Sequence, residues 1–357
     1  MRMAFFRRAA LFLVAVAGSL MASFCLSIVA TAADVVRIDG AGASFPAPLY
    51  QRWFHDYYLA HPDVMVDYQA VGSGAGMNML LEKRLDFAGS DLAMNQRELA
   101  ETAVPVVQIP MTAGAMVLVY QLEGVDKLRL SREAVVGIFL GTVTHWNDPL
   151  IVAANPGVDL PKTPITLVVR ADSSGTTFVM TSHLSAIDKT FSERIGATMT
   201  PQWPDALKKR GALLRAHGNG GVMALVRSIP GSIGYTQYAY AYNSNLSMAI
   251  LQNKTGQFVA PNDESFKAAV ESFRAEMDPK NLEDPQGADS YPILTLSWLV
   301  IRKDLADEAK LKTLQEVVRY CLTDGQTISA KLGYIPLSKA GIKTILEHTE
   351  WFGKTSK

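Results

Sequence analysis

Residues 35–48 read VVRIDGAGASFPAP, and this stretch introduces a pattern that later parts of the chain repeat. Val35–Ile38 is a short, mostly apolar run of the kind that forms a strand. The glycines that follow it permit a tight turn. Ser44 suits the N-cap of a helix, and Pro46 suits the first turn, where a missing N–H costs nothing. The stretch therefore predicts a strand that turns directly into a helix.

Two further junctions of this type follow along the chain. Val71–Gly76 comes after an apolar run that ends near Gln69, and Arg170–Thr177 comes after the run Ile165–Val169. Strand-like and amphipathic runs alternate, which is typical of an α/β fold with a largely parallel sheet. We expect strands at Val35–Ile38, Val64–Gln69, Met116–Tyr120, Ile165–Val169 and Leu296–Ile301, and helices at Leu49–Leu59, Met77–Arg84, Arg132–Leu140, Phe178–Ile187, Val222–Ser228, Glu264–Glu276 and Glu308–Leu322.

Each junction places glycines and hydroxyl side chains where a helix starts. The first N–H groups of a helix have no partner within it, and the helix dipole favours negative charge there, so such a junction can bind an anion. Ordinary helix capping explains one such junction. Three junctions, of which one begins with Arg170, favour a shared anion site. No G-x-x-x-x-G-K-[ST] motif occurs, and the glycine spacing does not fit a dinucleotide fingerprint.

The composition narrows the class of protein. A length of 357 residues suggests about two domains. The chain has 34 basic and 34 acidic residues, which argues against a nucleic-acid partner because such proteins carry a strongly basic domain. The hydrophobic fraction of 48% argues against disorder. The six histidines form no H-E-x-x-H motif and no cluster with cysteine, so we expect neither a metal nor a cofactor.

Residues 1–32 have the pattern of a secretory signal peptide. Three arginines and no acidic residue precede the apolar run Ala9–Val29, and the small residues of Ala30–Ala32 offer a cleavage site. The alternative is an uncleaved membrane anchor, since the run is long enough to span the bilayer core of about 30 Å. A lipoprotein would need a small residue before Cys25, and Phe24 stands there.

Cleavage after residue 32 would leave a mildly acidic protein, with 31 basic and 34 acidic residues and a net charge of −3. It would also leave Cys321 as the only cysteine, so no internal disulfide could form. Cys321 follows apolar residues at helical spacing, and we expect it to be buried. A chain of this length can be stabilised by its core alone.

The junctions and several later segments together resemble one known family, the periplasmic phosphate-binding proteins of the Pst phosphate importer. The segments run in order over most of the chain after residue 32: GAGASFPAP (40–48), YQAVGSGAG (68–76), DFAGSDLAM (86–94), GTVTHWNDPLI (141–151), VVRADSSGTTFVMTSHL (168–184), IPGSIGYTQYAYA (229–241) and YPILTLSWLVIRKD (291–304). Each segment alone is a weak signal, but the ordered set is specific.

The resemblance implies a periplasmic-binding-protein fold of type II. Two α/β lobes would be joined by a hinge, with the ligand in the cleft between them. Residues 33–113 and 293–357 would form the first lobe, and residues 114–292 the second. The chain would cross between the lobes near Pro110–Ala115 and again near Tyr291–Leu294.

The resemblance also implies which residues contact phosphate. Asp172 would hold the arginine in place, and Asp91, which as a carboxylate can only accept, would take the proton that phosphate keeps at neutral pH. Sulfate has no such proton, so Asp91 would select against it. The family usually has threonine where this chain has serine in the first junction. The implied contacts are Ser44, Phe45, Ser73, Asp91, Arg170, Ser174, Gly175 and Thr176.

The implied function is transport rather than catalysis. A monomer in the periplasm would capture inorganic phosphate and deliver it to the permease subunits of an ABC importer. Three alternatives remain open. The chain could bind another tetrahedral oxyanion such as sulfate or molybdate, or it could be a secreted structural protein with this fold. A phosphatase-like enzyme would need a nucleophile or a metal-bound water, and the sequence offers no clear candidate for either.

Overall fold

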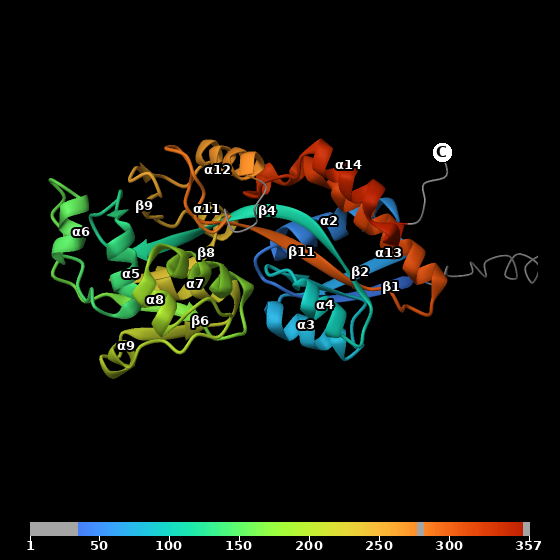
Figure 1. The fold of residues 1–357 in the computed structure, drawn as a ribbon, viewed down its shortest axis with the longest axis horizontal. Helices are drawn as coiled ribbons and strands as arrows, with labels where there is room; N and C mark the ends of the chain where they lie inside the picture. Colours follow the sequence, from blue (N-terminus) through green and yellow to red (C-terminus); the bar gives the residue numbers. More distant parts are fainter. Residues whose placement is uncertain (1–34, 277–281, 353–357) are drawn as a thin grey trace, which may run out of the picture. The chain divides into compact units, whose positions relative to one another are not determined.

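A computed structural model describes residues 35–276 and 282–352 of the chain (Figure 1). The predicted signal peptide, residues 1–32, lies outside the described residues. Contacts divide the chain into Met1–Val36 and Arg37–Lys357, and the second unit contains the fold described below. No helix within the described ranges is both long and apolar enough to cross a membrane.

The core of the fold is an eight-stranded mixed sheet in the order β2-β1-β3-β11-β4-β8-β6-β7. The expected α/β class is confirmed, but the sheet is parallel only toward its two sides, where β1 pairs with β3 and β6 pairs with β7 and β8. At the centre, β11 is antiparallel to β3 and β4, and β4 is antiparallel to β8. The strands are β1 Val36–Gly42, β2 Val64–Gln69, β3 Phe87–Ser90, β4 Val106–Gln121, β6 Thr166–Arg170, β7 Leu213–Ala216, β8 Ser232–Gln237 and β11 Leu294–Arg302.

Helices and short 3-10 turns connect the strands, and a small second sheet consists of β5 Arg129–Leu130, β9 Ile250–Gln252 and β10 Phe258–Val259. Each expected helix is present, with bounds shifted by up to a few residues. The helices are α2 Ala47–Ala60, α3 Ser73–Leu81, α4 Gln96–Glu101, α5 Arg132–Leu140, α6 Pro149–Ala154, α7 Gly175–Ile187, α8 Lys189–Arg194, α9 Asp205–Lys209, α10 Gly218–Ser228, α11 Tyr238–Asn243, α12 Asp263–Glu276, α13 Glu308–Leu322 and α14 Lys339–His348, with 3-10 helices at Asp324–Ile328, Ala330–Leu332 and Glu350–Phe352.

The first junction differs from its prediction in detail. β1 continues through the glycines to Gly42 before the chain turns, because Gly40 and Gly42 are still paired with β3. Pro46 takes the N-cap position of α2, and no side chain caps this helix. The prediction that Ser44 caps the helix was therefore wrong; its hydroxyl oxygen binds the start of α10 instead.

The long strand β4 changes partners at its middle. Val106 to Ala115 pair with β11, whereas Met116 to Gln121 pair with β8. Figure 1 shows β4 and β11 running side by side, and β4 continuing toward β8. The second crossing lies at the same level, since Met116 N donates a hydrogen bond of 3.1 Å to Ile293 O, one residue before β11 begins. The first connection between the two parts of the sheet is thus a continuous hydrogen-bonded strand, whereas the second, at residues 291–293, precedes β11 and is tied to β4 by the Met116–Ile293 hydrogen bond.

The core needs no disulfide. Cys321 is fully buried among apolar residues and free, as predicted, and burial raises the pKa of its thiol. Three tryptophans, Trp53, Trp146 and Trp203, are buried as well. The middle of β4 is inaccessible on both faces, as the continuous burial from Met111 to Tyr120 shows. Such strands are typical of a sheet that is covered by helices on both sides.

One close contact in this fold gives a direct test of the packing. Gly76 of α3 lies against the end of β1, where an added Cβ would stand 2.4 Å from Gly42 Cα and 2.7 Å from Ala41 O. Both are backbone atoms and cannot rotate away. Gly76→Ala should therefore lower the free energy of unfolding by about 1–3 kcal/mol, as overpacking usually does, measured by urea denaturation.

Gly220 in α10 is the matched control, because the nearest atom to an added Cβ is 3.7 Å away. Gly220→Ala should be neutral or stabilising by up to about 1 kcal/mol, since alanine favours helices over glycine. Equal effects of the two substitutions would contradict the described contact between α3 and β1.

Candidate functional site

The predicted site residues converge in one buried region, at the ends of β1, β3 and β6 and the starts of α3 and α7. Their proximity is shown by direct contacts between the segments. Asp91 N donates to Ser73 Oγ at 3.4 Å, and a Cβ on Gly175 would stand 2.4 Å from Ser73 Oγ and 2.9 Å from Asp91 Oδ2. The buried members are Ser44, Phe45, Ser73, Asp91, Arg170, Ser174, Gly175 and Thr176.

Arg170 is the last residue of β6, and its side chain is only 1% exposed. Its Nε donates to Asp172 Oδ1 at 2.8 Å, and its Nη2 donates to Asp172 Oδ2. Asp172 Oδ1 also accepts from Gly218 N at 3.1 Å. Burial alone would raise the pKa of Asp172, but the hydrogen bonds and charge of Arg170, together with Gly218 N–H, hold that pKa below its usual value.

This pairing leaves one of the two terminal nitrogens of the guanidinium without a hydrogen-bond partner within the described part of the chain. Arg170 Nη1 is buried and has no hydrogen-bond partner among the described residues. A charged donor in that state is costly unless an acceptor completes its shell. The site thus presents a fixed positive donor that the chain itself does not satisfy.

Asp91 follows β3, and one of its carboxylate oxygens has no hydrogen-bond donor among the residues described. Its Oδ1 accepts a hydrogen bond of 2.9 Å from Ser297 Oγ of β11, whereas its Oδ2 is buried without a partner in the described structure. Burial raises the pKa of Asp91 to about 7, although the Ser297 hydrogen bond and the charge of Arg170 both act to lower it. An unsatisfied buried acceptor therefore accompanies the unsatisfied buried donor.

Backbone donors at the helix starts complete the arrangement. Ser174 is the N-cap of α7: its Oγ accepts from Thr177 N at 3.1 Å, and its own N–H donates to Met199 O at 3.3 Å. The hydroxyl proton of Ser174 thus stays available, but its N–H does not. Four N–H groups make no hydrogen bond within the described ranges, and they belong to Phe45, Ser73, Gly175 and Thr176.

Sequence reasoning missed two residues of this region, Asn219 and Ser297. Asn219 is fully buried at the start of α10, where its N and Nδ2 donate to Ser44 Oγ at 3.0 and 2.9 Å. The signal was present as GNGG at 218–221, a fourth glycine-rich junction between a strand and a helix. Ser297 could have been noticed as a hydroxyl residue inside the apolar run of β11.

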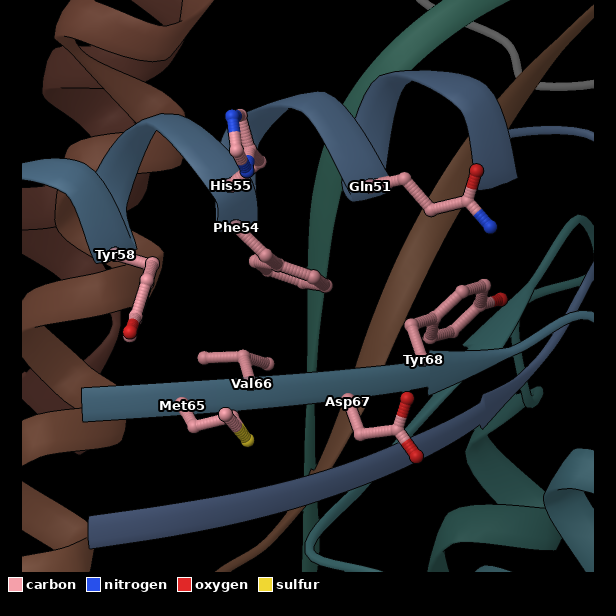
Figure 2. Close-up of a pocket in the computed structure, with 8 residues that line it drawn as sticks. All are labelled: Gln51, Phe54, His55, Tyr58, Met65, Val66, Asp67 and Tyr68. Atoms are coloured by element: carbon pink, nitrogen blue, oxygen red, sulfur yellow. The ribbon is translucent and has the colours of Figure 1, made fainter. Parts of the chain in front are cut away.

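A separate groove of about 290 Å³ lies between α2 and β2 (Figure 2). His55 and Tyr58 line it from α2, and Met65 and Asp67 line it from β2. None of its lining residues belongs to the predicted site, and none is a lysine or arginine. Its chemistry therefore offers no fixed positive charge for an anion.

The convergent site fits a small tetrahedral oxyanion that still carries a proton. Oxygen atoms of the anion can accept hydrogen bonds from Arg170 Nη1, from the hydroxyls and from the free N–H groups. Asp91 Oδ2 can accept a hydrogen bond from an O–H group of the anion. A fully ionised anion would leave that carboxylate unsatisfied and repelled.

Comparison with known proteins agrees with this chemistry. A model of the PBP superfamily domain matches residues 29–322. The phosphate-binding protein PstS of Xylella fastidiosa (strain Temecula1) is 35% identical over 319 residues, which cover 87% of this chain and 84% of that protein. The chain belongs to the PstS family of phosphate-binding proteins. The PstS of Haemophilus influenzae is 36% identical, with 88% of this chain and 92% of that protein covered.

Solved structures resemble the chain at the level of the fold. A periplasmic phosphate-binding protein, PfluDING, solved with phosphate, aligns with a TM-score of 0.69 at 21% identity and covers 87% of this chain and 93% of its own. An ABC-type phosphate transport receptor from Vibrio cholerae aligns with a TM-score of 0.54 at 16% identity, covering 84% and 100%. The type II fold expected from the PstS resemblance is thus confirmed.

The Arg170–Asp172 pair in this PstS-family chain can be tested by stability. Asp172→Ala should lower the free energy of unfolding by about 3–5 kcal/mol, because it leaves a buried guanidinium without its counterion. Replacing Arg170 as well, as Arg170→Met/Asp172→Ala, should recover part of that loss. Urea denaturation measures both variants. If the double variant is less stable than Asp172→Ala alone, the proposed cost of an unpaired buried charge is wrong.

Proposed function

We propose that this protein captures inorganic phosphate outside the cytoplasm and delivers it to an ABC-type phosphate importer. The observation that carries the proposal is the pair of unsatisfied buried atoms, Arg170 Nη1 and Asp91 Oδ2. One is a charged donor and the other an acceptor, and a protonated phosphate satisfies both at once. The PstS relatives, named as phosphate-binding proteins, support the same ligand.

Each predicted site residue has a part in this proposal. Arg170 binds phosphate oxygen through Nη1, and Asp172 keeps the guanidinium in place. The hydroxyls of Ser44, Ser73, Ser174 and Thr176 and the N–H groups of Phe45, Ser73, Gly175 and Thr176 donate to the remaining oxygens. Asp91 accepts the phosphate proton, as its unpartnered oxygen suggests.

We further propose two lobes that close on the ligand. The partner change of β4 between Ala115 and Met116, and the start of β11 at Leu294, support a first lobe of 33–113 and 293–357 and a second lobe of 114–292. Ser44, Ser73 and Asp91 would come from the first lobe, and the α7 and α10 starts from the second. Hinge motion at the two crossings would open the site.

The same proposal includes three further points. The protein catalyses no reaction, it is a monomer, and it delivers phosphate to the permease subunits of the importer. The predicted members include no histidine, cysteine or lysine, and the two carboxylates, Asp91 and Asp172, are assigned to the ligand proton and to Arg170, so no group remains to activate a nucleophile. The predicted signal peptide and the family support export to the periplasm. Sulfate and molybdate remain the competing ligands.

Ligand choice is tested by calorimetric titration of phosphate-free protein with phosphate and with sulfate. Phosphate should bind tightly and sulfate weakly, and a phosphomonoester should release no phosphate. Arg170→Ala should lose most of the phosphate affinity. Asp91→Asn should bind sulfate more tightly than the parent, because an amide can donate to an unprotonated oxygen and does not repel it.

Asp67→Asn is the matched control, since Asp67 is an exposed carboxylate on β2 outside the site. It should change neither affinity. Equal affinity of the parent protein for both anions would overturn the assignment of phosphate, and unchanged discrimination in Asp91→Asn would overturn the role of Asp91.

The raised pKa of Asp91 predicts how sulfate binding depends on pH. With a pKa of about 7, the carboxyl is neutral well below that pH and can then donate its own proton to sulfate. Above pH 7 it is ionised and repels the anion. Sulfate affinity should therefore fall about 30-fold between roughly pH 5.5 and pH 8.5, as one ionisation requires. Competition against labelled phosphate at each pH measures it, and Asp91→Asn should lack this dependence.

A further inference from the structure

We propose that Asn219 is the residue that aims the Ser44 hydroxyl at phosphate and holds the two lobes together in the closed form. The inference rests on the proposed function and adds a positioning residue to the site. Asn219 lies at the start of α10, in the proposed second lobe, and Ser44 follows β1 in the proposed first lobe.

The hydrogen bonds decide the direction of the Ser44 proton. Asn219 N and Asn219 Nδ2 both donate to Ser44 Oγ, at 3.0 and 2.9 Å. A hydroxyl oxygen accepts through two lone pairs and donates through one proton. Both acceptor positions of Ser44 are thus occupied by donors, so its proton must go to a different acceptor. No described residue accepts it, which leaves a phosphate oxygen as the partner.

The orientation of the Asn219 amide is fixed from its other side. Its Oδ1 accepts from Gln237 N at 3.1 Å and from Thr236 Oγ1 at 3.2 Å, both in β8. A backbone N–H can only donate, so the atom that faces Gln237 N must be the oxygen. The opposite end of the amide must then be the donor that faces Ser44. β8, a buried central strand, therefore determines that the Asn219 amide presents its NH2 group to Ser44.

The same amide also reaches the start of α7. Asn219 Nδ2 donates to Thr176 Oγ1 at 3.3 Å. One fully buried side chain thus contacts hydroxyls from two different segments of the site. Tyr240 adds to the link, since its hydroxyl donates to Ser44 O at 2.6 Å. Because Ser44 and Asn219 belong to opposite lobes, this contact exists only when the site is closed.

A double-mutant cycle between Asn219 and Ser44 tests the inference, with phosphate affinity and its rate constants as the readouts. Asn219→Ala should weaken phosphate binding about 10- to 100-fold, the usual consequence of losing one or two hydrogen bonds to a charged ligand. The loss should lie in the dissociation rate, because the contact forms after encounter. In a Ser44→Ala background the same substitution should cost much less, since there is no Ser44 proton to aim.

Asn155→Ala is the matched control. Asn155 is also a buried asparagine that binds backbone groups, donating to Arg129 O and Ile151 O and accepting from Arg129 N, each at 2.8 Å. It should lower the melting temperature but leave phosphate affinity unchanged. Asn219→Asp provides a variant of the same shape that keeps the acceptor toward Gln237 N. It should weaken phosphate binding more in the parent than in Ser44→Ala.

The outcomes separate the two claims. If the parent protein does not bind phosphate, the proposed function is wrong, and this inference falls with it. If the parent binds phosphate but Asn219→Ala and Asn219→Asp cost the same with and without Ser44, only the positioning role is wrong. Coupling in the cycle, together with normal binding by Asn155→Ala, supports the inference.

Discussion

A buried guanidinium is the constraint on which this site depends. Arg170 is enclosed at the end of β6, so its charge must be neutralised inside the protein. Asp172 supplies one carboxylate and is itself held by the first N–H of α10, which links the loops after β6 and β7. The remaining donor, Nη1, has no hydrogen-bond partner among the described residues. In the proposed function, the bound anion would supply that partner and complete the charge balance of the site.

The second buried carboxyl, Asp91, is the group to which the proposed function assigns selectivity. Its burial disfavours negative charge, which is why its pKa lies near 7. Under the proposed function, an anion that carries a proton would donate a hydrogen bond to this carboxyl, and an ionised carboxyl would repel an anion without one. The chain has equal numbers of acidic and basic residues, so its net charge supplies no general attraction for anions. In the proposed function, recognition would depend instead on local donors such as Arg170 and Ser44, which are held by Asp172 and Asn219.

Local signals in the sequence predicted much of this arrangement, and contacts between distant segments explain the rest. Glycine- and serine-rich junctions marked α3 and α7 because helix starts have strong local preferences. The roles expected for Asp91 and Asp172 follow from the family resemblance, not from the spacing of residues. Ser44 was assigned to a helix cap because its true partner, Asn219, lies 175 residues away. The antiparallel centre of the sheet was missed for the same reason, since β3 and β11 are neighbours only in space.

The late position of β11 in the chain also governs the order of assembly. β3 and the first half of β4 have their shared neighbour only once Leu294–Arg302 has been made. A growing chain that lacks this strand has unpaired strand edges in the middle of its sheet and cannot bury that part of the core. Pairing at the centre of the sheet can therefore be completed only after most of the polypeptide has been synthesised.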